Sequence, residues 1–232
     1  MAKYTYLLFN LFVILPVVAF AFHRNIKLQS KWKQLLLSIT AVAIPFVIWD
    51  VWAAQNGHWF FNEKYIFSTR LWGLPIEEIL FFICVPAVMW FVWEVVKVHV
   101  KARMSRSVVP RLVASSLFIA NAIIAIIYFD RGYTRSVAIA ACVTSFILSK
   151  SALLRERQFW VFQGAHLGLF IISNTFLTSL PIISYGSGSI IGIRIGTIPL
   201  EDFMFSYVLV TALLFVYRYT SGVLIKQRNV SE

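Results

Sequence analysis

The chain has 232 residues, of which 59% are hydrophobic, 16% aromatic and only 13% charged, and its mean hydropathy is +0.77. This composition excludes an ordinary soluble domain and leaves room for about seven membrane spans with short loops, but for no large extramembrane domain. The formal net charge of +11 does not indicate a nucleic-acid partner, because the basic residues lie between apolar runs, where they orient membrane helices.

Apolar runs along the chain predict an all-α membrane protein with seven transmembrane helices. The expected spans are residues 4–22, 35–53, 76–96, 112–128, 135–148, 159–177 and 200–217. The fifth run is the shortest of them. Cys84 and Cys142 fall inside apolar runs without a CxxC spacing, so we expect buried thiols and no disulfide framework.

The basic residues predict the orientation of the chain. Most of the 21 Lys and Arg residues fall in the loops after the first, third and fifth spans and in the C-terminal tail. These segments lie on one side of the membrane if every run crosses it. The positive-inside rule then places the amino terminus outside and the carboxyl terminus in the cytoplasm of a multi-pass cell-membrane protein.

One short motif occurs twice, at residues 74–78 and 198–202, which are 124 residues apart. At this offset the first three spans fall on the last three, and the fourth is left as a connector. We therefore expect two parallel three-helix repeats, residues 1–97 and 133–232, joined by a basic loop and linker helix at 98–132. Residues that match at the same offset are Arg70 and Arg194, Asp50 and Asn174, and Phe81 and Phe205.

Each copy of the motif places two neighbouring acids in the first turn of a span. Such acids can simply complement the helix dipole. Here, however, the pattern appears twice at one face of a membrane protein, where a charged side chain is costly. Adjacent carboxyls in an apolar setting repel each other, so one can hold a proton while another is ionised, which gives an acid and a base in one place. The predicted catalytic residues are Glu77, Glu78, Glu201 and Asp202.

Other residues near the motifs are candidates for supporting roles. Arg70 and Arg194 are expected to clamp ionised carboxylates, with a snorkelling interface arginine as the alternative. Asp50 is a candidate third acid, and Asn174 is its neutral counterpart in the second half. This difference suggests that the two halves are not equivalent.

Two phenylalanines are candidates for binding a carbocation. Phe81 and Phe205 lie one helical turn beyond Glu77 and Glu201, on the same face. Aromatic rings beside a proton donor can stabilise a passing cation through their faces. The alternative is an aromatic belt and ordinary core packing.

The segments around the two motifs resemble those of a known family. Residues 61–62 with 74–82, and residues 194–203, resemble the paired motifs of the integral-membrane lycopene cyclases. The resemblance covers nearly the whole chain and suggests the fused form of a family that also occurs as two small subunits. It implies cyclisation of the acyclic ends of lycopene to β-rings without flavin, another cofactor or net redox change. Ser206, where the first half has Phe82, leaves open whether each half treats one end.

The implied chemistry follows from the substrate. A carboxylic acid protonates the terminal double bond, the next alkene attacks the tertiary cation, and a base removes a ring proton. The implied partners are lycopene and lipid, and the family is compatible with a homo-oligomer or with association with other carotenoid enzymes. The ring isomer, the number of ends closed and the proton donor within each pair stay open.

The sequence lacks the residues that several other classes of membrane protein require. A retinal protein needs a lysine in the last helix, but none occurs between Lys150 and Lys226. Clustered histidines for a di-iron centre and acid-rich motifs for magnesium diphosphate are both missing, so no metal site is expected. Two alternatives remain: a proton-coupled membrane carrier, and a cyclase that acts on another acyclic carotenoid.

Overall fold

The computed structural model describes residues 2–22 and 28–231, with side chains to Gly222. The described chain is an all-α membrane fold, as predicted: it contains seven helices that are long and apolar enough to cross a membrane. They are α1 (Thr5–Ala19), α2 (Trp32–Gln55), α3 (Ile76–His99), α4 (Val109–Ile127), α5 (Gly132–Lys150), α6 (Arg157–Ser179) and α7 (Leu200–Ser231). Short 3-10 helices are η1 (Ala2–Tyr4), η2 (Leu28–Lys31) and η3 (Ala152–Arg155).

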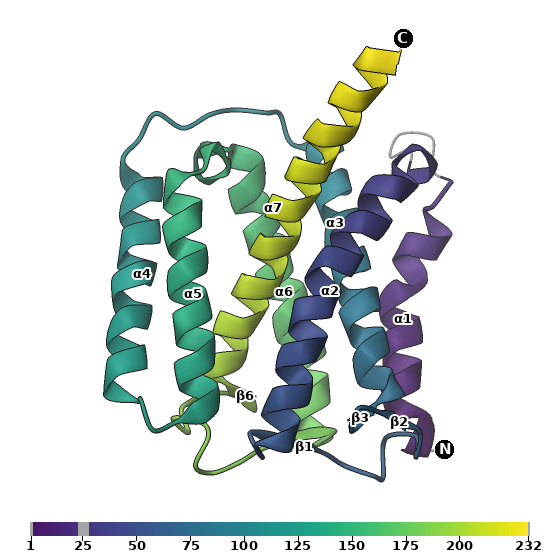
Figure 1. The fold of residues 1–232 in the computed structure, drawn as a ribbon, viewed down its shortest axis with the longest axis vertical. Coiled ribbons are helices and arrows are strands. Elements are labelled where there is room, and N and C mark those ends of the chain that lie inside the picture. Colours follow the sequence, from purple (N-terminus) through teal and green to yellow (C-terminus); the bar gives the residue numbers. More distant parts are fainter. Residues whose placement is uncertain (1, 23–27, 232) are drawn as a thin grey trace.

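The helices alternate in direction, so that α1, α3, α5 and α7 all run away from the end that carries the N-terminus (Figure 1). We call this end the strand end and the opposite one the tail end. The first helix packs on α3, and the fifth packs on both α4 and α7. The second helix packs against α3 and α7. The core therefore lies among α2, α3, α5 and α7, with α4 at the side of the bundle (Figure 1).

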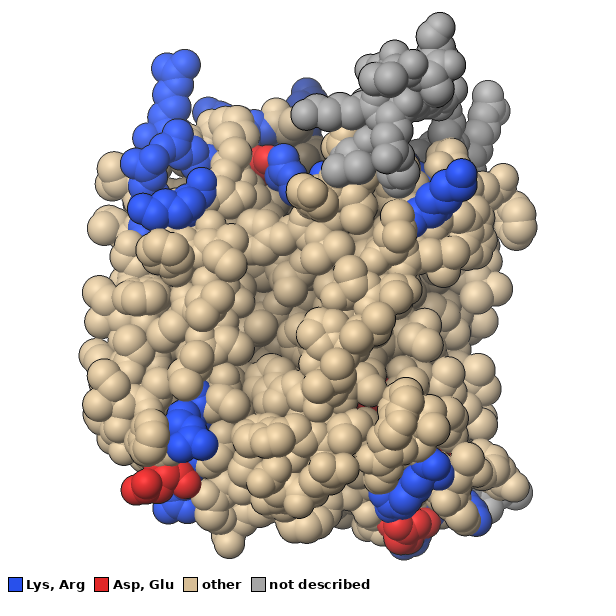
Figure 2. Space-filling model, viewed as in Figure 1, with Lys and Arg blue, Asp and Glu red and all other residues tan. Residues whose placement is uncertain are grey.

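The outer surface suits a bilayer. Figure 2 shows a broad uncharged band between two ends that carry Lys, Arg, Asp and Glu. Large apolar side chains such as Phe12, Ile126 and Ile172 are more than two thirds exposed within this band. Arg24 and Lys27, which contributed to the predicted orientation, lie outside the described residues, and the orientation stays a prediction.

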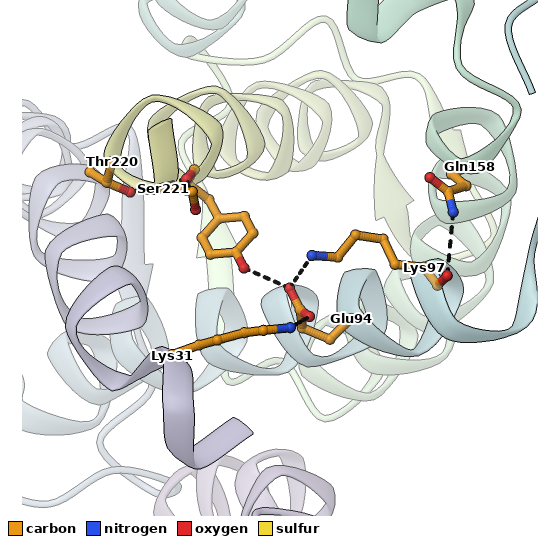
Figure 3. A network of polar contacts seen from close by, with 7 residues as sticks. Lys31, Glu94, Lys97, Gln158, Thr220 and Ser221 are labelled. Carbon is orange, nitrogen blue, oxygen red and sulfur yellow. Dashed lines mark hydrogen bonds and ion pairs between the residues drawn. The ribbon is translucent and has the colours of Figure 1, made fainter. Parts of the chain in front are cut away.

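A buried acid joins three elements at the tail end. Glu94 of α3 is 1% exposed and forms ion pairs with Lys31 of η2 and with Lys97, the latter at 2.6 Å. The Tyr217 hydroxyl of α7 donates a hydrogen bond to the same carboxylate at 2.7 Å. Gln158 donates to the main-chain carbonyl of Lys97 (Figure 3). This network fixes the tail ends of α3 and α7 to the start of α2.

Six short strands lie between the helices at the strand end, and the sequence analysis did not predict them. They are β1 (Trp59–Phe61), β2 (Arg70–Leu71), β3 (Leu74–Pro75), β4 (Ile183–Tyr185), β5 (Arg194–Ile195) and β6 (Ile198–Pro199). The pairs β2–β3 and β5–β6 are antiparallel hairpins, each leading directly into α3 or α7. The pair β1–β4 joins the two halves of the chain, with Trp59 opposite Tyr185 and Phe61 opposite Ile183.

The two hairpins carry the same contacts 124 residues apart. Ile76 N–H donates to the Thr69 carbonyl at 3.2 Å, and Leu200 N–H donates to the Ile193 carbonyl at 3.0 Å. The turn residue Gly73 has a φ of +90°, a conformation that glycine adopts without the steric cost that a side chain adds. Each hairpin thereby ends at the first residue of its long helix, which fixes where the acids stand.

Candidate functional site

The helices α3 and α7 begin directly after the motif prolines. Pro75 is the N-cap residue of α3, so Glu77 is the second helical residue. The acids of both motifs do occupy first turns, as expected. Neighbouring residues in a helix point about 100° apart. The two acids of each pair therefore face different surroundings.

Glu77 and Glu201 hold the loops that precede the hairpins. Each side chain is 0% exposed. A Glu77 carboxylate oxygen accepts the Phe67 N–H at 2.7 Å, and Glu201 accepts the Ile191 N–H at the same distance. The Thr134 hydroxyl also donates to Glu201, at 2.5 Å. Neither acid lines the neighbouring cavity, so their visible role is to fix main chain.

The second acid of each pair faces an apolar cavity of about 650 Å³. Glu78 and Asp202 both line it, together with Asp50 of α2. The three acids are at most 5% exposed. Acids from both halves of the chain thus share one cavity. Aromatic residues in its wall are Trp59, Phe81, Phe82, Tyr133, Tyr185 and Phe205.

Two of the cavity acids come from the first half and lie together. The carboxyl groups of Asp50 and Glu78 are close enough to influence each other electrostatically, and Asp50 Oδ2 has no hydrogen-bond partner. The indole N–H of Trp59 donates to Asp50 at 2.6 Å, and the hydroxyl of Tyr6 donates to Glu78 at 2.6 Å. Two carboxyls in contact repel each other when both are charged, and a shared proton removes this repulsion. This arrangement can hold a proton inside the membrane.

Asp202 is surrounded by hydrogen-bond donors. Tyr185 donates to it at 2.5 Å, Tyr133 at 2.9 Å and Asn174 at 3.0 Å. Tyr185 lies on β4, outside the membrane spans. Burial raises its pKa well above the ordinary value, and the negative charge of Asp202 adds to the increase, so this phenol stays protonated and keeps donating. All three donors meet the same carboxyl group, so Asp202 is held in a fixed position at the cavity wall.

The predicted clamp by two arginines is wrong. Arg70 pairs with Glu63 and donates to the Gly73 carbonyl at 2.9 Å. Arg194 donates to the Thr197 carbonyl at 2.6 Å, and its guanidinium lies over the Tyr185 ring, 5.7 Å from the centroid. Both arginines are exposed. They reach the carbonyls of their own turns before they can reach the acids, so they stabilise the hairpins.

Four further predicted site residues do line the cavity: Asp50, Phe81, Asn174 and Phe205. Asp50 and Asn174 both line it, each beside the acid that the repeat assigns to its half. Phe81 and Phe205 also line it, and the Phe205 ring lies 5.2 Å from that of Trp49. Both phenylalanines therefore face the space in which a substrate would meet the acids.

The sequence analysis missed the donors to these acids. The residues that were not singled out are Tyr6, Tyr133, Tyr185 and Trp59. They come from α1, α5, β4 and β1, and helical periodicity gives no information on contacts between such distant elements. The segments 59–61 and 183–185 do lie 124 residues apart, and this offset was the available signal.

The fold and the site together define an integral membrane protein whose buried carboxyls surround an apolar cavity. Among the described residues, no group of three or more His, Cys, Asp or Glu side chains is arranged to hold a metal ion. A family model described as lycopene cyclase matches residues 3–96 and 130–220. The chain therefore belongs to the lycopene cyclase family and is a multi-pass carotenoid cyclase. No curated protein and no solved structure matches it.

Proposed function

We propose that the chain is a lycopene β-cyclase, which converts the acyclic ends of lycopene to β-ionone rings. The observation that carries this proposal is the apolar cavity lined by three buried acids, of which Asp50 and Glu78 come from the first half and Asp202, with its three hydrogen-bond donors, from the second. An alkene has no polar group for a protein to hold. Its cyclisation therefore depends on an acid, a base and an apolar wall that excludes water.

The proposed reaction is an isomerisation. The Asp50–Glu78 pair gives its proton to the terminal double bond, and the tertiary cation forms at the neighbouring carbon. The π electrons of the next alkene make the new carbon–carbon bond, which moves the positive charge into the ring. Asp202 then takes a ring proton, and the electrons of that C–H bond become the ring double bond. One proton enters and one leaves, so the product has the formula of the substrate.

The roles of the remaining predicted residues divide accordingly. Phe81 and Phe205 stabilise the cation through their ring faces, and Asn174 positions Asp202 by its hydrogen bond. Glu77 and Glu201 are proposed to act through the loops they bind, not through contact with the polyene. This division replaces the equal role first assigned to all four motif acids.

A single site formed by both halves is the simplest proposal for the repeat. Residues 1–97 and 133–232 would be three-helix units, linked by residues 98–132. The matching loop contacts of Glu77 and Glu201 at the 124-residue offset support this division. One shared site closes one ring at a time, so the two ends of lycopene react in sequence. With the amino terminus outside, the site lies near the outer face of the cell membrane.

The test is expression in a host that accumulates lycopene, followed by chromatography of the extracted pigments. Monocyclic and then bicyclic β-carotenes should replace lycopene in cells that express the chain. An Asp202→Asn variant, present in the membrane at the same level, should leave lycopene unchanged. If lycopene persists with the unmodified chain, the β-cyclase proposal is wrong, and another acyclic carotenoid should be supplied next.

A further inference from the structure

The cavity is not enclosed, because part of its wall also faces the bilayer. Leu8 and Phe12 of α1 line the cavity and are 58% and 74% exposed on the outer surface. Leu169 and Ile172 of α6 also line it and are 45% and 72% exposed. Residues that belong both to a cavity and to the lipid-facing surface mark its mouth. The mouth therefore lies between α1 and α6.

The opposite side of the cavity is closed. Asp50, Glu78 and Asp202 are nearly inaccessible, and Trp59 of β1 and Tyr185 of β4 line the cavity and donate hydrogen bonds to Asp50 and Asp202. The walls are held because both α1 and α6 pack on α3. The polar groups thus lie at the closed end, and the mouth is lined by hydrocarbon side chains.

The two helices at the mouth meet in a small buried cluster that includes Phe9 of α1 and Leu177 of α6. Phe9 of α1 stacks on Phe176 of α6, with ring centroids 5.5 Å apart and ring planes inclined by 9°. Among the described elements, α1 makes its extensive helix contacts with α3 alone. Pro16 of α1 also lines the cavity, and a proline inside a helix removes a main-chain hydrogen bond. Widening of the mouth would therefore disturb chiefly the buried cluster of Phe9 and Leu177.

We propose that a linear C40 polyene hydrocarbon enters sideways from the bilayer between α1 and α6, with one end leading. The leading end reaches the three acids, and the remainder of the chain stays in the mouth and the surrounding lipid. The half-cyclised product leaves by the same mouth and returns with its other end first. This proposal rests on the proposed cyclase function, and it adds the route and the order of events.

The mouth residues Leu8, Phe12, Leu169 and Ile172 have hydrocarbon side chains without polar groups. This chemistry favours a hydrocarbon as the molecule that passes through the mouth. A charged or hydroxylated substrate would lose water at this mouth without finding hydrogen-bond partners there. A polyene passes from lipid tails to Leu, Phe and Ile side chains without such a cost. Among the described residues that line the cavity, the strongest acids it then meets are the carboxyls at the closed end.

The test links the two helices reversibly. Phe9→Cys and Phe176→Cys are combined in a chain that also carries Cys84→Ala and Cys142→Ala, and the new thiols are joined by a short bifunctional methanethiosulfonate. The control pair is Phe118→Cys with Phe146→Cys. These rings lie 6.4 Å apart on α4 and α5 and do not line the cavity. Purified protein is mixed with lycopene in detergent before or after linking, and bound pigment is measured by its absorbance.

Linking α1 to α6 should lower the rate of lycopene uptake by about tenfold or more. It should also trap lycopene that was bound beforehand, and reductant should reverse both effects. Linking the control pair should change neither. Uptake and release that are unaffected by the α1–α6 link would overturn the route. All chains used for binding also carry Asp202→Asn, so pigment binding is measured without turnover. A blocked uptake by a protein that, with Asp202 restored, does not cyclise lycopene would reject the proposed function and keep the route.

A second pair of variants does not depend on the thiols. Ile172 and Ile126 are the same residue type and are 72% and 76% exposed, but only Ile172 lines the cavity. Ile172→Trp should slow lycopene uptake several-fold by narrowing the mouth, and Ile126→Trp should leave it unchanged. Equal uptake by the two variants would also contradict entry between α1 and α6.

Discussion

Trp59 and Tyr185 stand opposite each other in the β1–β4 pair, and each donates a hydrogen bond to a different acid of the cavity. Trp59 donates to Asp50 at 2.6 Å and Tyr185 to Asp202 at 2.5 Å. The strand pair outside the membrane thereby fixes the distance between the acid sites of the two halves. A short sheet at the edge of the fold therefore determines the geometry of the proposed site.

The two acids of each motif should differ sharply when they are replaced. Glu78→Gln and Asp202→Asn should lower cyclase activity by about 10²–10⁴-fold, the usual effect of losing a general acid or base. Both amides keep the shape of the side chain and can still accept a hydrogen bond, so the proteins should insert and fold. Activity is measured as carotene formed per amount of membrane-inserted protein.

Glu77→Gln and Glu201→Gln provide the matched comparison. Each replaces the other acid of the same motif with the corresponding amide. These variants should retain measurable activity and instead lose stability, by about 1–3 kcal/mol for a weakened hydrogen bond to a charged group. Their midpoints of thermal unfolding in detergent should fall. A complete loss of turnover at an unchanged midpoint would return Glu77 and Glu201 to the catalytic group.

The difference between Asp50 and Asn174 predicts opposite outcomes for the exchange of acid and amide. Asp50→Asn removes one member of the pair that holds the proton, so turnover should be lost at every pH. Asn174→Asp replaces an amide donor to Asp202 with a carboxyl that donates only when protonated. Its activity should be about tenfold lower at neutral pH and should recover as the pH falls. A flat pH profile for Asn174→Asp would contradict the role of this hydrogen bond.

His58 should make stability depend on pH. Burial lowers the pKa of this imidazole, and the positive charge of Arg135 lowers it further. The Nδ1 atom lies 3.0 Å from the Ser189 hydroxyl, and the Nε2 atom has no hydrogen-bond partner. The unfolded chain therefore binds a proton more readily than the folded chain. Stability contributed by neutral His58 should be lost as the pH falls below about 6.5, the ordinary value for histidine.

The measurement is the difference in unfolding midpoint between the unmodified chain and His58→Gln from pH 7.5 to 5. This difference should shrink or change sign toward acid pH, because only the unmodified chain must accept a buried charge. A difference that stays constant over the range would show that His58 is not the titrating group.

The network around Glu94 predicts a loss of stability without a loss of chemistry. Glu94→Gln leaves Lys31 and Lys97 without their carboxylate. Breaking a fully buried ion pair costs about 3–5 kcal/mol. The lysine side chains are about one third exposed, so we expect roughly 1–3 kcal/mol and a midpoint several degrees lower. Glu63→Gln, which breaks the exposed pair with Arg70, should leave the midpoint nearly unchanged.

The helices could be predicted from the sequence because their signal is local. A run of apolar residues long enough for the bilayer identifies a span without knowledge of its neighbours, and even the short run at 135–148 is part of a full helix. The β1–β4 pair has no such signal. It consists of three residues on each strand, joined across more than half of the chain.

The candidate site was predictable only in part for the same reason. The motif acids, Asp50 and Asn174 could be found from charge in apolar surroundings and from the repeat. Which acid of each pair faces the cavity depends on the tilt and rotation of α3 and α7, which packing decides. The arginines were misassigned because the turn carbonyls of Gly73 and Thr197, which they bind, exist only once the hairpins form.

The register of β1 and β4 is centred on Phe60 and Ser184, which are themselves 124 residues apart. A strand paired in this way could equally pair with an identical copy of itself, as in the self-complementary interface of a symmetric dimer. In a symmetric dimer, every replacement appears on both sides at once. Joining the halves into one chain removes that restriction, so an aspartate can stand at position 50 while an asparagine stands at 174. Covalent fusion thus allows one half to supply the proton and the other to receive it.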